Sequence, residues 1–455
     1  MIILLMFHST KIMATLGPAS SSKAMVKKLL NHGTNSFRLN TAHGDLGQYN
    51  RMVANVKAVS NDVPVVVDLK GPEMRCVLKN PLSVSRGTTA WFGFSAKDEF
   101  SFNRDFYSNV KVGSKIFFED GRCGAKVIEK KDRKLKLGFS GSFELKSNKG
   151  VNVPGVGLDF PALSKRDKNI ISWAKGKGLH VFALSFCRSA SDVLALKKVL
   201  GDEPIIISKI ESNEGVKNFR EILSVSDGIM VARGDLGVEV KKERIPLLQK
   251  KMIMRCLNEG KFSIVATQML ESMIKNPYPS RAEVSDIANS VLDGADCLML
   301  SGETAIGSYP VESVKEMRSA CEAVEEKVPN LVDMKFSSST SDSVTKTIYR
   351  LSHYLKVNRI IAFTKSGYTC QMISRFRTKV PVIGVSWKKR TMNLLGFYFG
   401  VVPVAVKKEP RSSREIISLL MKQKLLKKGN KVILTGNMAS GKEQHSNMIE
   451  VQEIR

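Results

Sequence analysis

Two stretches of the chain decide its fold: Pro204-Ile205-Ile206-Ile207-Ser208-Lys209-Ile210-Glu211 and Gly228-Ile229-Met230-Val231-Ala232-Arg233-Gly234-Asp235. Each begins as an unbroken apolar run, which is typical of a strand buried on both faces of a parallel sheet. Each ends in charged residues, and ionised groups are costly to bury unless they are paired or bind a metal. Two carboxylates and a lysine at neighbouring strand ends therefore predict a cation site beside a cationic catalytic group.

Eight strand-like runs alternate with amphipathic helical segments before residue 330. The runs span residues 10–16, 36–40, 63–69, 181–186, 205–210, 228–231, 263–267 and 297–300. This alternation predicts an α/β protein built on a (β/α)8 TIM barrel, in which the chemistry lies at the C-terminal strand ends. We expect the unusual polar residues of the chain at those ends. Gly33, Gly260 and Gly294 follow three of the helical segments, where a left-handed C-cap is expected.

The pattern also predicts three domains, since the 455-residue chain is too long for one core. Residues 1–75 and 155–330 would form the barrel. Residues 76–154, with short alternating strands and no long helix, would form a small inserted β-barrel domain. Residues 331–455, which begin with a serine-rich joint at 337–343, would form a C-terminal α/β domain with an open, mostly parallel sheet.

The composition limits the classes of function. The seven cysteines are scattered and form no CxxC pair, which argues against a disulfide framework or a thiolate zinc site and favours a reducing cytoplasm. No apolar run is long enough to span a bilayer. The net charge is +28, but the basic clusters are not interleaved with aromatic residues. This favours a basic surface that attracts anionic metabolites over a nucleic-acid-binding protein.

The residues that carry chemistry follow strand ends. Glu211 and Asp235 are hard oxygen ligands suited to Mg²⁺, and Lys209 is a point charge suited to a phosphoryl group. A structural ion pair at the rim is the alternative, and the matching strand ends make it the weaker one. Arg38 follows the second strand and offers a planar donor fork for phosphate. Thr267 ends the seventh strand, where its hydroxyl is either a proton relay or a cap of the next helix.

One near match to a nucleotide-binding loop is set aside. Gly436-Asn437-Met438-Ala439-Ser440-Gly441-Lys442-Glu443 resembles a P-loop and follows a strand. Glu443 replaces the hydroxyl residue that would hold Mg²⁺, and another strand rather than a helix is expected next. We therefore do not expect it to bind nucleotide.

Taken together, the motifs of this chain resemble those of the pyruvate kinase family, in the family's order and over nearly the whole chain. The matching strings are Thr15-Leu16-Gly17-Pro18-Ala19-Ser20, Arg38-Leu39-Asn40, Lys70-Gly71-Pro72-Glu73, Lys149-Gly150-Val151-Asn152-Val153-Pro154-Gly155, Ser208-Lys209-Ile210-Glu211, Arg233-Gly234-Asp235-Leu236-Gly237, Ala266-Thr267-Gln268-Met269-Leu270 and Ser301-Gly302-Glu303-Thr304-Ala305. The resemblance implies transfer of the phosphoryl group of phosphoenolpyruvate to ADP, giving pyruvate and ATP. It also implies a homotetramer.

The resemblance implies roles for the residues at the phosphoryl group. Glu211 and Asp235 would hold Mg²⁺ or Mn²⁺. Lys209 and Arg38 would bind the phosphoryl group in flight. The resemblance also assigns residues to the rest of the substrate: Gly234 by its backbone N–H, Ser185, and Thr267 close to the methylene carbon during enolate protonation.

The resemblance further implies a nucleotide site that includes Asn40, His43, Arg75 and Lys149. Taken alone, without its neighbours, His43 is better interpreted as a hydrogen-bonded rim histidine. Lys149 belongs to the insertion, so that domain would act as a lid that brings its charge in on closure.

The potassium site implied by the resemblance is incomplete in this chain. Asn40 and Asp68 are retained, but Ala42 stands where the family has a serine and Leu69 where it has a threonine that contributes its carbonyl. Glu73 remains the glutamate associated with potassium-dependent members. We therefore expect K⁺ to bind weakly, or with water in place of the lost hydroxyl.

A loop in the C-terminal region resembles the one that holds an effector phosphate in regulated members of the family. Its residues are Thr364, Lys365, Ser366, Gly367 and Thr369. Glycine and hydroxyls before a helix suit an anion nest, and equally a capped helix start.

Two other classes of function remain as alternatives on the sequence. One is a metal-dependent aldolase or lyase acting on pyruvate-type enolates, which would not need the insertion with Arg75 and Lys149. The other is an RNA- or partner-binding protein on an inactivated kinase scaffold, against which the filled metal and lysine positions argue.

Overall fold

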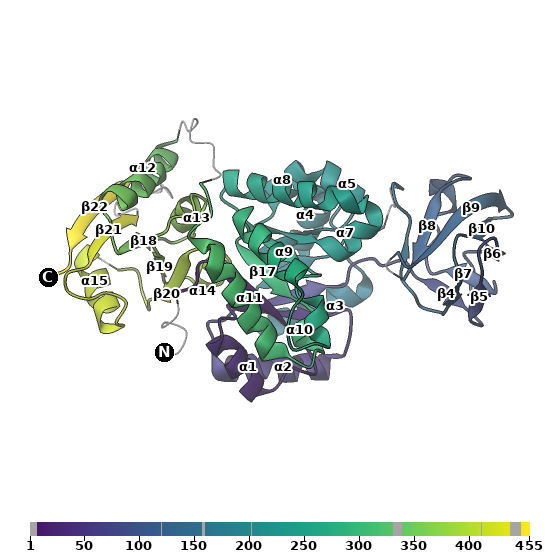
Figure 1. Ribbon diagram of the computed structural model, residues 1–455, viewed down its shortest axis with the longest axis horizontal. Helices are drawn as coiled ribbons and strands as arrows, with labels where there is room; N and C mark the ends of the chain where they lie inside the picture. The colour runs from purple at the N-terminus through teal and green to yellow at the C-terminus, as the bar shows by residue number, and fades with distance from the viewer. Residues whose placement is uncertain are drawn as a thin grey trace.

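The centre of the molecule is a closed barrel of eight parallel strands in the order β1-β17-β16-β15-β14-β13-β3-β2 (Figure 1). The structure is a computed structural model that describes residues 7–119, 121–156, 160–201, 203–330, 339–410, 412–436 and 447–455. The barrel strands are β1 (Lys11–Leu16), β2 (Ser36–Asn40), β3 (Val65–Leu69), β13 (Val181–Leu184), β14 (Ile205–Ile210), β15 (Gly228–Ala232), β16 (Phe262–Ala266) and β17 (Cys297–Leu300). The predicted (β/α)8 barrel is therefore confirmed, and each predicted strand agrees within two residues at either end.

Helices surround the barrel, the longer ones with an apolar stripe packed against the outer face of the strands. They are α1 (Lys23–Asn31), α2 (Leu46–Val59), α3 (Lys165–Gly176), α4 (Ala190–Leu200), α5 (Asn213–Lys217), α6 (Phe219–Val225), α7 (Arg233–Glu239), α8 (Ile245–Asn258), α9 (Arg281–Leu292), α10 (Gly302–Ala305) and α11 (Pro310–Glu325), with the 3₁₀ turns η2 (Lys242–Arg244) and η3 (Glu271–Ile274). Local sequence fixes their ends. Ser280 and Glu283 form a capping box at the start of α9. Gly33, Gly260 and Gly294 have φ of +108°, +66° and +91° after α1, α8 and α9, as predicted.

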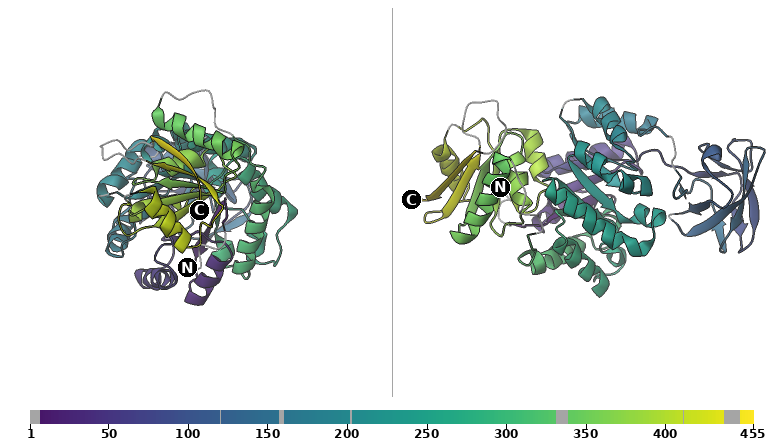
Figure 2. Two further views of the ribbon diagram at one scale, coloured as in Figure 1. Left: turned by 90° about the vertical axis from the view of Figure 1, so that its left-hand side faces the viewer. Right: turned by 90° about the horizontal axis from the view of Figure 1, so that it is seen from above.

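The insertion after β3 is built of short strands around an aromatic-rich core. Its elements are β4 (Cys76–Leu78), β5 (Leu82–Val84), β6 (Thr89–Phe92), β7 (Phe100–Phe102), η1 (Tyr107–Asn109), β8 (Lys115–Phe118), β9 (Cys123–Lys131), β10 (Lys134–Phe139), β11 (Phe143–Leu145) and β12 (Val151–Asn152). They form a five-stranded sheet in the order β12-β8-β9-β10-β6 and two small ribbons, β11-β5 and β4-β7. Both Figure 1 and the right-hand view of Figure 2 place this insertion and the C-terminal region at opposite ends of the barrel.

The C-terminal region has a five-stranded sheet in the order β20-β19-β18-β21-β22, parallel except for β22. Its elements are α12 (Thr340–Tyr354), β18 (Arg359–Phe363), α13 (Tyr368–Ser374), β19 (Val382–Ser386), α14 (Lys389–Leu395), β20 (Val401–Ala405), α15 (Ser413–Lys422), β21 (Lys431–Gly436) and β22 (Met448–Glu453). The sequence prediction missed α14 and β20, because α14 is short and β20 is an edge strand that contains Pro403. Most of the near P-loop and residues 337–338 of the serine-rich joint lie outside the described residues.

A buried ion pair joins the C-terminal region to the barrel at the N-terminal ends of its strands. Arg377 Nη2 lies 3.0 Å from Asp296 Oδ1, and these side chains are 0% and 2% exposed. The same carboxylate accepts hydrogen bonds from the backbone N–H groups of Ser263, at 3.0 Å, and Phe399, at 3.1 Å. The expectation that unusual polar residues occur at the C-terminal strand ends is therefore wrong for Asp296, which directly precedes β17 at the N-terminal end of that strand. Its partners Arg377 and Phe399 lie far away in the sequence, so no local pattern indicates the ion pair.

All seven cysteines are buried and unpaired, as expected from their spacing. Among the described residues, no helix combines the length and apolar character that a membrane span requires.

Replacing Arg377 by Ala is expected to destabilise the protein by about 3–5 kcal/mol, because it leaves the Asp296 carboxylate buried without its cation. The matched control is Asp62→Ala, which removes the exposed Asp62–Lys389 pair (3.2 Å) between the same two regions. That exposed pair is expected to contribute about 0–1 kcal/mol. The measurement is the shift in thermal unfolding midpoint, and equal shifts for the two variants would contradict this account.

Candidate active site

The C-terminal ends of the barrel strands bring charged side chains from distant parts of the chain to one rim. Asp68 comes from β3, Arg38 from β2 and Lys209 from β14, and Glu211 directly follows β14. Lys209 and Glu211 are only 8% and 1% exposed. Such buried charges persist only where partners compensate for the lost water.

Lys209 has three polar partners. Its Nζ lies 2.7 Å from Ser185 Oγ, 2.9 Å from Glu211 Oε1 and 3.3 Å from Asp68 Oδ1. Burial disfavours the charged form of Lys209, but the carboxylates of Asp68 and Glu211 outweigh burial and raise its pKa to about 12. Lys209 is therefore a fixed positive charge at any working pH.

Asp68 links Lys209 to Arg38. Arg38 Nε lies 2.6 Å from Asp68 Oδ2, and Arg38 Nη1 lies 3.3 Å from the hydroxyl oxygen of Thr15. Burial alone would raise the pKa of Asp68, but Lys209 and Arg38 together hold it below its usual range. The carboxylate of Asp68 therefore holds two cationic groups side by side at the rim.

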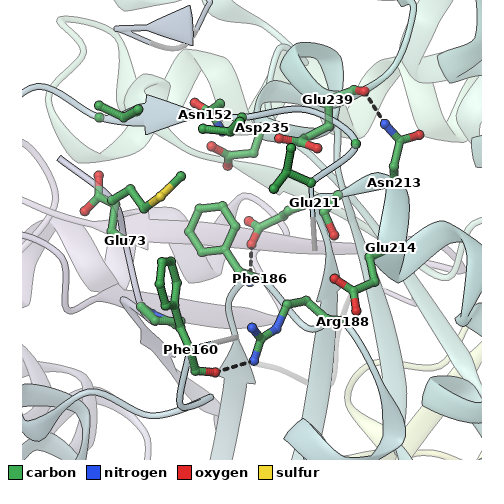
Figure 3. A pocket seen from close by; sticks show the side chains of 18 of the residues that line it. Glu73, Asn152, Phe160, Phe186, Arg188, Glu211, Asn213, Glu214, Asp235 and Glu239 are labelled. Atoms are coloured by element: carbon green, nitrogen blue, oxygen red, sulfur yellow. Dashed lines mark hydrogen bonds between the residues drawn. The ribbon is translucent and has the colours of Figure 1, made fainter. Parts of the chain in front are cut away.

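Glu211 and Asp235 both line a cavity of about 510 Å³ together with Lys209 and Arg38. Glu211 Oε2 accepts a 2.6 Å hydrogen bond from the backbone N–H of Phe186, which fixes the orientation of the carboxylate. Figure 3 shows this bond in a neighbouring cavity of about 310 Å³, to which Glu211 and Asp235 also contribute. Hard carboxylate oxygens at an open cavity fit a magnesium ion, which often takes one or two protein carboxylates. No larger group of His, Cys, Asp or Glu suited to a metal occurs in the part of the chain that the structure describes.

Glu239, at the end of α7, connects the barrel to the insertion across this neighbouring cavity. Burial raises the pKa of Glu239 to about 7, and hydrogen bonds from Asn213 and from the Asn152 side chain oppose the shift. The sequence analysis did not single out this residue.

Thr267 and Gly234 meet at the next part of the rim, where β16 and β15, the strands that follow β14 around the barrel, end. The backbone N–H of Gly234, in the first turn of α7, donates a 2.8 Å hydrogen bond to Thr267 Oγ1. The next short helix, η3, has Leu270 at its N-cap position and no side-chain cap bond. The capping alternative for Thr267 is therefore wrong.

The residues expected at a nucleotide line the same cavity of about 510 Å³: Asn40, His43, Arg75 and Lys149. Two of them are paired with carboxylates. Arg75 Nη2 lies 2.7 Å from Glu73 Oε2, and Lys149 Nζ lies 2.7 Å from Glu119 Oε1. His43 is exposed at the rim. The walls of this cavity come from both the barrel and the insertion.

The residues of the expected potassium set lie at this cavity as well. Asn40, Ala42, Asp68 and Leu69 all line it. Asn40 Oδ1 accepts a 3.1 Å hydrogen bond from the backbone N–H of Ala42. Glu73 lies between two cations, since Lys70 Nζ is 3.0 Å from its carboxylate and Arg75 is on its other side.

The loop with Thr364, Lys365, Ser366 and Gly367 lies apart from this site, between β18 and α13 of the C-terminal region, and Thr369 lies in the first turn of α13 (Figure 1). Thr364 Oγ1 accepts a 2.9 Å hydrogen bond from the backbone N–H of Gly367, and Ser366 Oγ accepts one of 3.4 Å from Tyr368. Gly367 adopts φ +93°. The loop therefore forms a turn closed by its own hydroxyls.

Arg233 and Asp286 belong to this rim, but the sequence analysis assigned neither of them a role. Arg233 is 7% exposed and lies between the carbonyl oxygen of Thr267, at 2.7 Å, and Asp286, at 2.7 Å. Arg233 follows a buried strand, which was a usable signal. Asp286 lies within a helix, and nothing in its local pattern distinguishes it from a solvated side chain.

Comparison with known proteins connects this site to a family. The family model described as pyruvate kinase, barrel domain, matches residues 7–314, and the one described as pyruvate kinase, alpha/beta domain, matches residues 342–452. A protein of Bacillus licheniformis named pyruvate kinase is 36% identical over 473 residues, covering 98% of this chain and 80% of that protein. Proteins of the same name from Clostridium acetobutylicum and Staphylococcus aureus are also 36% identical over 98% of this chain, covering 100% and 80% of their own lengths.

Proposed function

Since the chain belongs to the pyruvate kinase family, we propose how its rim residues divide the work of that family's reaction. The reaction transfers the phosphoryl group of phosphoenolpyruvate to ADP and gives pyruvate and ATP. The observation that carries the proposal is the single cavity lined by Lys209, Glu211, Asp235 and Arg38. Family membership sets aside an enolate aldolase or lyase, and the presence of Lys209, Glu211 and Asp235 at the cavity argues against an inactivated RNA-binding scaffold.

Phosphoryl transfer asks a protein mainly for positioning and electrostatic stabilisation. Lys209 places a permanent positive charge against the phosphoryl oxygens. Arg38 uses Nε to bind Asp68 and Nη1 to bind the Thr15 hydroxyl, so the guanidinium is held in place and Nη2 would serve the same group. Ser185 holds the Lys209 ammonium group in place. A divalent ion, Mg²⁺ or Mn²⁺, held by Glu211 and Asp235 would neutralise the charge that develops on the substrate oxygens.

The remaining rim residues would bind the carboxylate and methylene groups of phosphoenolpyruvate and the phosphates of the nucleotide. Gly234 would donate its N–H to the carboxylate of phosphoenolpyruvate, and Thr267 would lie close to the methylene carbon that is protonated. Arg75 and Lys149, which pair with Glu73 and Glu119, would exchange these carboxylates for nucleotide phosphates. Asn40 and His43 would complete the nucleotide site, and Lys149 ties its completion to the position of the lid.

Replacing Glu211 by Gln, or Asp235 by Asn, is expected to lower kcat about 10²- to 10³-fold, because each change removes a charge that stabilises the transition state. The assay couples pyruvate formed from phosphoenolpyruvate and ADP to lactate dehydrogenase, with and without Mg²⁺. The same variants should bind Mn²⁺ more weakly in an electron paramagnetic resonance titration.

The matched control is Glu214→Gln, a carboxylate-to-amide change in the neighbouring cavity. It should leave Mn²⁺ affinity unchanged. Undiminished Mn²⁺ binding in both Glu211→Gln and Asp235→Asn would overturn the proposed metal site, and an absence of pyruvate formation by the unmodified protein would overturn the proposed function.

We propose that K⁺ binds near Asn40, Asp68 and the carbonyl of Leu69, with water in place of the missing serine hydroxyl. The Asp68 carboxylate already accepts hydrogen bonds from Arg38 and Ser185 and pairs with Lys209, which leaves less of its charge for a monovalent ion. This arrangement supports weak binding.

Replacing Ala42 by Ser is expected to lower the K⁺ concentration that gives half-maximal activity, because it restores an oxygen ligand. The measurement is the initial rate across a potassium series at saturating substrates, with Na⁺ holding ionic strength constant. Saturation of the unmodified protein at low potassium would show that the hydroxyl is not needed.

An anionic effector bound by Thr364, Lys365, Ser366, Gly367 and Thr369 remains a proposal beside the simpler turn. If it binds, sugar phosphates or nucleotides should change the initial rate, and Lys365→Ala should remove the response while basal activity stays unchanged. A rate that none of these ligands alters would favour the turn alone.

We also propose that the protein is a cytoplasmic homotetramer. Seven unpaired cysteines suit a reducing compartment. Sedimentation equilibrium should give four times the mass of the chain, and a monomer mass would rule out the tetramer.

A further inference from the structure

Two consecutive residues at the rim adopt a backbone conformation that side chains disfavour. Thr267 has φ +68° and Gln268 has φ +56°, both in the left-handed region. For a β-branched residue such as threonine this conformation is an outlier, and it persists only where the surroundings enforce it. Thr267 is also the residue proposed to lie near the reacting carbon, so what enforces its conformation bears on the reaction.

The guanidinium of Arg233 provides that enforcement. Arg233 Nε and Nη2 both donate to the carbonyl oxygen of Thr267, at 3.2 and 2.7 Å, and Nη2 also donates to the carbonyl oxygen of Gln268 at 3.1 Å. Because the guanidinium is planar and rigid, these bonds fix the two carbonyls relative to each other. A lysine ammonium would supply charge without that fork.

The charge of Arg233 is balanced from the opposite side. Arg233 Nη1 donates to Asp286 Oδ1 at 2.8 Å, and Asp286 belongs to α9. Asp286 therefore orients the guanidinium toward the two carbonyls. Arg233 itself is 7% exposed, so little water competes for its donors.

The next residue along the chain holds the other end of Thr267. Gly234 donates its N–H to Thr267 Oγ1 at 2.8 Å. The first turn of α7 thus fixes the carbonyl of Thr267 through Arg233 and the hydroxyl of Thr267 through Gly234. This double contact sets where the hydroxyl points.

We propose that Arg233 is a positioning residue for the proton-transfer step, acting through Thr267, with Asp286 orienting it. This inference rests on the proposed role of Thr267 at the methylene carbon. The phosphoryl group is held by Lys209 and Arg38, which come from other strands, so losing Arg233 should slow proton transfer more than phosphoryl transfer.

The test isolates proton transfer as the exchange of pyruvate methyl protons with solvent. In this enolisation a methyl C–H bond breaks, the proton passes to solvent, and the electron pair remains in the enolate. Exchange in D₂O is followed by proton NMR with the full-length holoenzyme in Mg²⁺ and K⁺. Phosphoryl transfer is measured separately in a single turnover of phosphoenolpyruvate and ADP.

Arg233→Lys is expected to slow the exchange about 10- to 100-fold, up to the loss that a misplacement of the reacting groups by about 1 Å causes, and to slow phosphoryl transfer less. Asp286→Asn should slow exchange by a smaller factor and serves as the second variant if Arg233→Lys fails to fold. Mn²⁺ affinity should be unchanged in both, which shows that Asp235, two residues away, is undisturbed.

A double-mutant cycle with Thr267→Ala decides whether Arg233 acts through Thr267. In the Thr267→Ala background, adding Arg233→Lys should slow exchange little further, because coupled residues are not additive. Independent, additive effects, or equal slowing of exchange and phosphoryl transfer, would overturn the inference. If Thr267→Ala alone leaves exchange unchanged, the proposed role of Thr267 is wrong instead.

Discussion

The pairing of Lys209 with Asp68 and Glu211 is the interaction on which the rest of the site depends. An ammonium group that is 8% exposed would lose its proton if it stood alone in a barrel core. Two carboxylates reverse that tendency and raise its pKa to about 12. Asp68 also anchors Arg38, and Glu211 lines the cavity where the metal is expected. Loss of either carboxylate would therefore disturb the position or charge of the cationic groups expected to bind the phosphoryl group.

The residues that line the substrate cavity and those that join the barrel to the C-terminal region lie at opposite ends of the barrel strands. At the C-terminal strand ends the charged groups line an open cavity and can exchange partners with substrate. At the opposite end, Asp296 and Arg377 are enclosed between the barrel and the C-terminal region, where no substrate reaches them. The stacked rings of Phe262 and Phe397, 4.9 Å apart, lie at the same junction. The contact that joins the two regions therefore lies outside the catalytic cavity.

Sequence patterns predicted what depends on short-range regularity. The apolar runs predicted the barrel strands to within two residues at either end. The charged residues at the ends of two of these runs predicted that Lys209, Glu211 and Asp235 lie at one site, and all three line one cavity. Three features escaped prediction because each depends on a partner far away in the chain. Asp296 directly precedes β17 but pairs with Arg377 of the C-terminal region. Asp286 lies in a helix, and its role depends on its contact with Arg233. The strand β20 forms at the edge of a sheet, where its pairing with β19 defines it. The roles assigned to the nucleotide and potassium residues depended on family resemblance, since no spacing distinguishes them from a charged rim.

The burial of the cysteines has a practical consequence for attaching a fluorescent label to the insertion. Burial raises the pKa of every one of the seven thiols, in the insertion as well as in the barrel and the C-terminal region. Because the thiolate is the reactive form, alkylating reagents and mild oxidants find few targets on the folded enzyme. A single cysteine introduced on the outer surface of the insertion would therefore take up a maleimide dye almost alone. Fluorescence could then test whether the insertion opens and closes during turnover, without the removal of any native thiol.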